Sequence, residues 1–357
     1  MPKKVSEPVF DGHNDVLFRL WKKSTSHPES DFLDGDNEGH LDLPRMRKGG
    51  FVGGLFAVYV PTPGESLDKL DELMRGTRYD VPLSPVMQAS EAMPTALAMM
   101  AILFRIERAS QGAFKVCRNA AEIRLCVANG VIAAVLHMEG AEAIDRDLDA
   151  LELFHQAGLR SLGPVWSRPT IFGHGVPFRY PSTGDTGPGL TDAGKALVRA
   201  CNELGIAIDL SHMTEKGFWD VAKLSSKPLI ASHSNAHAIS PHARNLTDKQ
   251  LDAIAGSGGL VGLNFATCFL RPDGQRGTDT PIELMLRHLD HLIERLGEGH
   301  VGLGSDFDGA NIPEGIGDVT GLSALRAAMR KHGYGEALLR RLCHGNWIDV
   351  LERTWGG

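Results

Sequence analysis

Cysteine is scarce in this sequence, and its placement excludes two common kinds of site. Only five cysteines occur among 357 residues, at positions 117, 126, 201, 268 and 343. Their number is odd and no two form a C-x-x-C pair, so the sequence predicts neither a disulfide framework nor a zinc site built on thiolates. Free thiols are typical of a reducing compartment, and we expect a cytoplasmic location.

Long hydrophobic runs and an excess of positive charge are also missing. The longest uninterrupted apolar run covers residues 96–104, whereas a helix that crosses a bilayer needs about 20 apolar residues. The first residues, MPKKVSEPVF, have no apolar segment behind their lysines, so no secretory signal is expected. With 37 basic and 44 acidic residues the net charge is −7. We therefore expect neither a membrane nor a nucleic acid as partner.

The sequence does contain a repeated alternation of short apolar segments with helical ones. Eight segments have the length and composition of buried strands. They cover residues 9–15, 49–61, 130–140, 159–166, 206–212, 228–234, 259–265 and 300–309. Amphipathic helices are expected between them, for example over 192–205 and 281–297.

This alternation predicts the fold class. Apolar strands separated by helices form a parallel sheet covered on both faces, and eight of them favour a closed (β/α)8 barrel of the TIM type. The chain is longer than the ~250 residues of a typical barrel, so insertions are expected. We predict a single catalytic domain over residues 1–357.

The first predicted strand carries a polar pair in the stretch DGHNDVL, residues 11–17. Residues i and i+2 of a strand point to the same side, so His13 and Asp15 converge on one point. Two ligands for one cation are one interpretation. The other is a core histidine that forms a hydrogen bond with its neighbour.

Four more potential metal ligands lie where other predicted strands end. These residues are Glu139, His212, His233 and Asp306. Active sites of (β/α)8 barrels lie at the C-terminal ends of the strands, so all six side chains would face one mouth. Three histidines and three carboxylates suit two divalent ions about 3.5–4 Å apart, with Glu139 as the natural bridge. Zinc is favoured over manganese, cobalt or iron. The alternative is a set of ordinary polar strand ends.

Several stretches together resemble the membrane (renal) dipeptidase family, over nearly the whole length. Besides DGHNDVL, they are residues 43–61 (LPRMRKGGFVGGLFAVYVP), 135–144 (VLHMEGAEAI), 209–213 (DLSHM), 232–248 (SHSNAHAISPHARNLTD), 259–265 (GLVGLNF), 301–309 (VGLGSDFDG) and 343–352 (CHGNWIDVLE). The resemblance implies an amidohydrolase-type barrel that carries zinc. Many relatives on this barrel have H-x-H on the first strand, so H-x-D points to dipeptidases rather than to deaminases or phosphotriesterases.

The resemblance also implies roles for individual residues. One zinc would be held by His13, Asp15, Glu139 and Asp306, and the other by Glu139, His212 and His233. A hydroxide that bridges the metals would attack the peptide carbonyl, and Asp306 would take the proton and deliver it to the departing amine. Arg244 matches the family's substrate arginine, which engages the dipeptide carboxylate or the developing oxyanion.

One position departs from the family pattern. After the fourth predicted strand the family usually has a histidine that helps to polarise the scissile carbonyl, whereas here Trp166 takes its place. An indole N–H donates a hydrogen bond but cannot be a cation. Either His174, eight residues later, takes over the role, or the indole of Trp166 reshapes the pocket. We favour the second alternative, because Trp166 lies at a strand end.

We therefore expect a cytoplasmic, zinc-dependent dipeptidase with two zinc ions per chain, acting on small dipeptides. The family's tolerance of a D-residue at the C-terminal side extends the expected substrates. Another amidohydrolase, namely an N-acyl amino acid amidase or a lactonase, is the alternative among enzymes. A binding protein without catalysis is a further alternative, although the complete ligand set weighs against it. Relatives suggest a homodimer.

Overall fold

Eight parallel strands form the barrel that the sequence predicts. The computed structural model describes residues 7–64 and 67–356. The barrel strands are β1 (Val9–Asn14), β2 (Phe51–Tyr59), β5 (Ile132–Glu139), β6 (Leu159–Gly163), β8 (Ala207–Ile208), β9 (Ile230–Ala231), β10 (Leu260–Asn264) and β11 (Val301–Gly304). Each lies within one of the predicted segments, and their spatial order is β8-β6-β5-β2-β1-β11-β10-β9. Neighbouring strands therefore follow the chain order, as in a (β/α)8 barrel.

The barrel closes between β8 and β9, and this pairing, the β8–β9 seam, is short. It consists of a parallel bridge between Asp209 and Ile230 and a main-chain hydrogen bond of 2.9 Å from Leu210 N to Ile230 O. By contrast, β2 pairs with β5 over seven residue pairs, from Gly53 to Tyr59 on β2. Closure at β8 and β9 therefore depends on few main-chain contacts.

Among the described residues, three short strands lie outside the predicted set. β4 (Phe114–Val116) pairs in parallel with the first half of β5, and β6 pairs with the second half. β3 (Tyr79–Asp80) and β7 (Arg179–Tyr180) form a separate antiparallel pair. Each of these three strands contains a charged residue and at most two apolar ones. The equally short strands β8 and β9 lie within longer apolar segments, which is why the sequence indicates them and not the other three.

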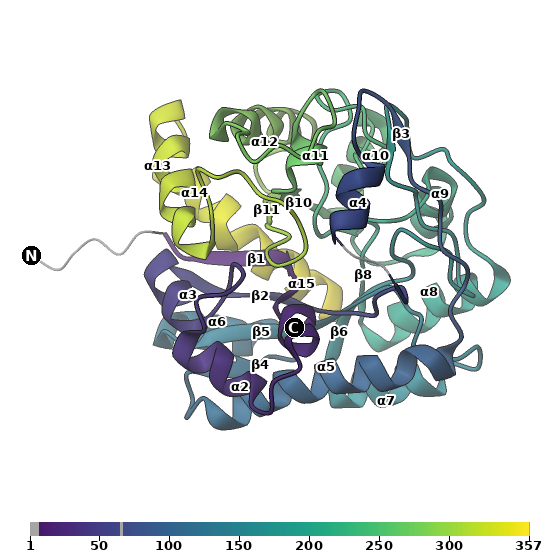
Figure 1. Ribbon diagram of the computed structural model, residues 1–357, viewed down its shortest axis with the longest axis horizontal. Helices are drawn as coiled ribbons and strands as arrows, with labels where there is room; N and C mark the ends of the chain where they lie inside the picture. Colours follow the sequence, from purple (N-terminus) through teal and green to yellow (C-terminus); the bar gives the residue numbers. More distant parts are fainter. Residues whose placement is uncertain (1–6, 65–66, 357) are drawn as a thin grey trace, which may run out of the picture.

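Helices surround the barrel (Figure 1). Their bounds are α1 (Val16–Lys23), α2 (Pro28–Ser30), α3 (Leu43–Gly49), α4 (Leu67–Leu73), α5 (Ala89–Ala109), α6 (Ala120–Asn129), α7 (Asp149–Ala157), α8 (Asp192–Leu204), α9 (Glu215–Leu224), α10 (Asp248–Gly256), α11 (Thr267–Leu270), α12 (Ile282–Leu296), α13 (Leu322–His332), α14 (Glu336–Arg340) and α15 (Asn346–Trp355), with short π or 3-10 turns η1 (Asp31–Gly35), η2 (Val319–Gly321) and η3 (Arg341–Gly345). The predicted helices over 192–205 and 281–297 correspond to α8 and α12. Thr191 caps α8 by accepting a hydrogen bond from Gly194 N, and Gly205 ends the helix at a positive φ of 68°.

The long helix α5 explains the most apolar stretch of the sequence. Within the described residues it is the one helix long and apolar enough to cross a membrane. It packs against α1, α2, β2 and β4, and its fully buried residues Ala92, Ala96, Met99, Leu103 and Ile106 recur every three or four positions. Such a stripe is that of a helix packed on a core, so packing accounts for the apolar composition.

The C-terminal helix α15 contacts β1, β8, β10 and β11 of the barrel. Trp347 on this helix is fully buried, and its indole donates a hydrogen bond of 2.8 Å to Leu303 O. The predicted polar residues at the strand ends lie at the C-terminal mouth of the barrel, where the chain leaves each strand.

Candidate metal centre and substrate pocket

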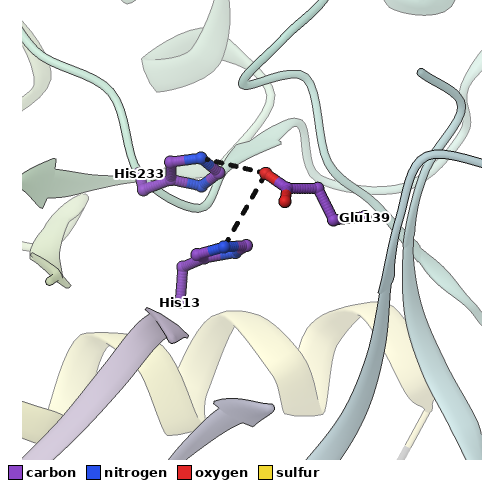
Figure 2. A group of neighbouring side chains, drawn as sticks. All are labelled: His13, Glu139 and His233. Atoms are coloured by element: carbon purple, nitrogen blue, oxygen red, sulfur yellow. Dashed lines mark ion pairs between the residues drawn. The ribbon is translucent and has the colours of Figure 1, made fainter. Parts of the chain in front are cut away.

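The six predicted metal ligands come together at the C-terminal mouth of the barrel. His13 lies on β1 and Glu139 is the last residue of β5. Asp15, His212, His233 and Asp306 lie in the segments that directly follow β1, β8, β9 and β11. All six side chains are buried. Figure 2 shows His13, Glu139 and His233 pointing toward one another.

Glu139 lies at the centre of this cluster. Its Oε1 is 3.1 Å from His212 Nε2, 3.3 Å from His233 Nε2 and 3.7 Å from His13 Nε2. One carboxylate oxygen therefore faces three imidazole nitrogens. The dashed lines of Figure 2 mark two of these ion pairs.

A second group of ligand atoms overlaps with the first. The ligand atoms of His13, Asp15 and Asp306 lie within 4.8 Å of one another, as do those of His13, Glu139 and His233. His13 Nε2 is 3.2 Å from Asp15 Oδ2. Two adjoining groups of N and O donors therefore share His13. The predicted division of the six ligands between two ions, with Glu139 shared, stays a prediction.

Burial strongly shifts the pKa values of several side chains in this cluster. Burial raises the pKa of Glu139 well above its usual value, and it also raises the pKa of Asp306. Burial lowers the pKa of His212 and His233 well below the usual value. For His13, burial lowers the pKa, but the charges of Glu139 and Asp15 outweigh it and raise the pKa to about 10. Bound cations would stabilise the ionised carboxylates at such a site.

Two further observations fit a metal at this place. His13 Nδ1 and Asp15 Oδ1 are buried and have no hydrogen-bond partner, although buried polar atoms are normally paired. A Cβ atom on Gly309 would overlap Asp15 Oδ2 and Asp306 Oδ1, so the chain leaves this space free by using glycine. Imidazole and carboxylate donors are those that zinc and related divalent ions accept.

Sequence reasoning missed the groups that hold the ligands in place. Asn264 Nδ2 donates a hydrogen bond of 2.9 Å to Asp306 Oδ2, and Ser167 Oγ lies 2.8 Å from His212 Nδ1. Asn264 is the last residue of β10, so its place at a strand end was a usable signal. Ser167 lies in an irregular segment, where the sequence carries no periodicity.

A pocket adjoins the cluster and has about 920 Å³ of empty space, including the solvent space at its open mouth. Five of the six predicted ligands belong to its wall, namely Asp15, Glu139, His212, His233 and Asp306. Most of the other wall residues are apolar or aromatic. Among the described residues of the wall, Lys22 and Arg276 carry positive charge. Such a combination of a few convergent polar groups with an apolar wall is typical of a site for a small molecule.

Trp166 is part of this wall. Its ring lies 5.0 Å from that of Tyr59, 5.6 Å from that of Phe178 and 5.9 Å from that of His212, centroid to centroid. Arg168 lies 5.7 Å from the Trp166 ring and donates a hydrogen bond of 2.8 Å to Glu142 Oε1. The indole therefore belongs to an aromatic cluster in the pocket wall, beside the predicted ligand His212.

Arg244 and His174 lie outside the described pocket wall. Arg244 is buried behind the ligands, where Nη1 donates to Ser211 O and Nη2 donates at 3.0 Å to His233 O. Burial lowers the pKa of its guanidinium to about 10. His174 Nδ1 lies 3.2 Å from Gly189 O. The substrate roles of both residues stay predictions, and this placement of His174 favours the alternative based on Trp166.

Comparisons with known proteins agree with this geometry. The sequence profile of membrane dipeptidases (peptidase family M19) matches residues 4–355. An uncharacterised protein from the pqqA 5′ region of Klebsiella pneumoniae is 48% identical over 256 residues, which cover 72% of this chain and 94% of that protein.

Two crystal structures are similar over almost the whole chain. One is the dipeptidase AC, a metallopeptidase of family M19, and the other is a metallopeptidase from Rhodobacter sphaeroides liganded with a phosphinate mimic of the dipeptide L-Ala-D-Ala. Each is 61% identical to this chain with a TM-score of 0.96, and each match covers 98% of this chain and 99% of the other. Profile, fold and buried ligand cluster agree, and the chain belongs to the membrane dipeptidase family, peptidase family M19, as a metal-dependent hydrolase of peptide bonds.

Proposed function

We propose that this dipeptidase holds two zinc ions. His13, Asp15, Glu139 and Asp306 would hold one ion, and Glu139, His212 and His233 would hold the other. The observation that carries the proposal is the position of Glu139 Oε1, which lies 3.1–3.7 Å from three imidazole nitrogens beside a second carboxylate-rich group. When bound, the two ions supply hydroxide near neutral pH by lowering the pKa of water, and they polarise the scissile carbonyl.

Asp306 is the proton carrier in this proposal. It is buried at the cluster, and the Asn264 amide holds its Oδ2, which leaves Oδ1 to accept a proton and to return it to the departing amine. An amide anion is a very poor leaving group, so peptide cleavage needs such a delivery.

The proposed substrates are small dipeptides, including those with a D-residue at the C-terminal side. The Rhodobacter sphaeroides metallopeptidase, at 61% identity, is liganded with a mimic of L-Ala-D-Ala, which supports this class. We assign the aromatic wall around Trp166 to the substrate side chains. Arg244 would contribute positive charge toward the substrate carboxylate, from its position behind His212 and His233.

We also propose a cytoplasmic protein that forms a homodimer, without a membrane or nucleic-acid partner. All five cysteines are free and buried, which supports a reducing compartment. Size-exclusion chromatography with light scattering tests the dimer, because a monomer at assay concentrations contradicts it.

Turnover on a substrate panel tests the function. The panel pairs L-Ala-D-Ala with L-Ala-L-Ala, with an N-acetyl amino acid and with a lactone, each with zinc-loaded and chelator-treated protein. We expect hydrolysis of the dipeptides, close to two metal ions per chain by elemental analysis, and loss of activity on strong chelation. Turnover of the N-acyl amino acid or the lactone alone would favour the other amidohydrolase activities. A metal content near zero in an active preparation would contradict the zinc proposal.

A further inference from the structure

Asp209 is a buried carboxylate that lies behind the metal cluster and contacts none of the six ligand side chains directly. It follows β8 and accepts four hydrogen bonds. Ser211 N and Ser232 N donate to its Oδ1 at 3.1 and 2.8 Å. Ser211 Oγ donates to Oδ1 at 2.6 Å and Ser232 Oγ donates to Oδ2 at 2.5 Å. Four donors on one buried carboxyl group require its ionised form, which can only accept.

The direction of these hydrogen bonds determines the state of His233. A serine hydroxyl has a single hydrogen, and Ser232 gives it to Asp209. Ser232 Oγ also lies 2.7 Å from His233 Nδ1, so at this second contact the hydroxyl oxygen accepts and Nδ1 carries the hydrogen. In neutral His233 the lone pair is then on Nε2, the atom that lies 3.3 Å from Glu139 Oε1 and 3.1 Å from His212 Nε2.

We propose that Asp209 is a positioning residue that, through Ser232, keeps His233 in the tautomer whose Nε2 can bind a metal ion. At many metal-bound histidines, a carboxylate in direct contact with the ring determines which nitrogen carries the hydrogen. Here the carboxylate of Asp209 does so through the hydroxyl of Ser232. Asp209 also joins β8 to the segment after β9, across the seam where main-chain contacts are few. The inference rests on the proposed function only in taking His233 as a ligand.

Replacing Asp209 by Asn reverses the chain of hydrogen bonds. Three donors, two of them main-chain N–H groups, converge on Oδ1, so the Asn carbonyl oxygen must occupy that place. The NH₂ group then occupies the place of Oδ2 and donates to Ser232 Oγ. The Ser232 hydroxyl turns its hydrogen to His233 Nδ1, and the ring hydrogen moves to Nε2. A protonated Nε2 cannot bind a metal ion, which is the wrong-tautomer effect of an isosteric Asp-to-Asn change.

Two serine variants separate tautomer control from support of the barrel seam. Ser232→Ala and Ser211→Ala each remove one hydroxyl that donates to Asp209, and each leaves the main-chain N–H bond to Asp209 in place. Of the two hydroxyls, that of Ser232 lies against the His233 ring, whereas that of Ser211 accepts from His233 N at 3.1 Å. Ser211→Ala is therefore the matched control.

The experiment measures zinc affinity by chelator competition and the melting temperature of the metal-free protein, for wild type and the three full-length variants. We expect zinc binding to weaken by about 10- to 100-fold in Asp209→Asn and Ser232→Ala and by less than about threefold in Ser211→Ala. Equal losses in Ser232→Ala and Ser211→Ala, or wild-type affinity in Asp209→Asn, would overturn the proposal. A fall in affinity that only parallels the melting temperature would assign Asp209 to barrel support and would also overturn it. These outcomes do not depend on which substrate is cleaved.

Discussion

Replacement of Asp306 by Asn tests the proposed proton carrier with little structural disturbance. Asp306 has a positive φ of 60°, a conformation that Asn tolerates about as well as Asp. The Asn carbonyl oxygen can accept the 2.9 Å hydrogen bond from Asn264, so the side chain keeps its orientation. The side chain can then neither accept nor return a proton. Five of the six proposed ligands are unchanged, so the variant can be loaded with metal.

We expect kcat to fall by a factor of about one hundred or more in Asp306→Asn, because general acid–base groups contribute 10²–10⁴ to the rate. A hundredfold loss corresponds to about 2.7 kcal/mol in the activation free energy. KM should change less than kcat, since the proton is transferred only as the reaction proceeds. The assay is steady-state hydrolysis of L-Ala-D-Ala, with the zinc content of each sample measured in parallel.

Asp308 provides the matched control for this experiment. It lies in the same loop, has a positive φ of 69° and has a buried side chain, but its carboxylate accepts from His40 N at 2.5 Å and from Arg19 Nε at 3.3 Å. Asp308→Asn should lower the melting temperature through these contacts and leave kcat within a few-fold. A kcat close to that of wild type in zinc-loaded Asp306→Asn would refute the proton-carrier role. Equal kcat losses in both variants would point to disturbance of the loop instead.

Three further predictions concern the pocket and the proposed metal ligands. Trp166→Phe should change which dipeptide side chains are accepted, whereas His174→Ala should leave turnover within a few-fold; a large kcat loss confined to His174→Ala would reverse this assignment. Arg244→Gln should raise KM mainly for substrates with a free carboxylate, because it removes the positive charge behind His212 and His233, and equal losses on amidated substrates would instead assign Arg244 to holding the main chain at Ser211 and His233. Gly309→Ala should displace Asp15 and Asp306, and zinc retention after dialysis at the wild-type level would contradict that expectation.

The barrel and the position of its ligands follow from the sequence because both depend on local pattern. Strand segments such as 130–140 are continuous apolar runs, and a run of this kind indicates a strand buried on both faces. Parallel strands all end at the same mouth, so the polar residue that closes each run, such as Glu139 or His233, must face the same space. The order of strands around the barrel then adds no further uncertainty, because it equals the order along the chain.

Tertiary structure alone decided how the other side chains are used. The tautomer of His233 depends on Asp209, which is 24 positions earlier and reaches it only across the β8–β9 seam. Trp166 belongs to the pocket because Tyr59 and Phe178 pack around it, while His174 turns toward Gly189 O. The residues in these contacts lie far apart along the chain, at irregular intervals. Which side chains meet depends on how the whole barrel closes, so a local sequence pattern cannot predict it.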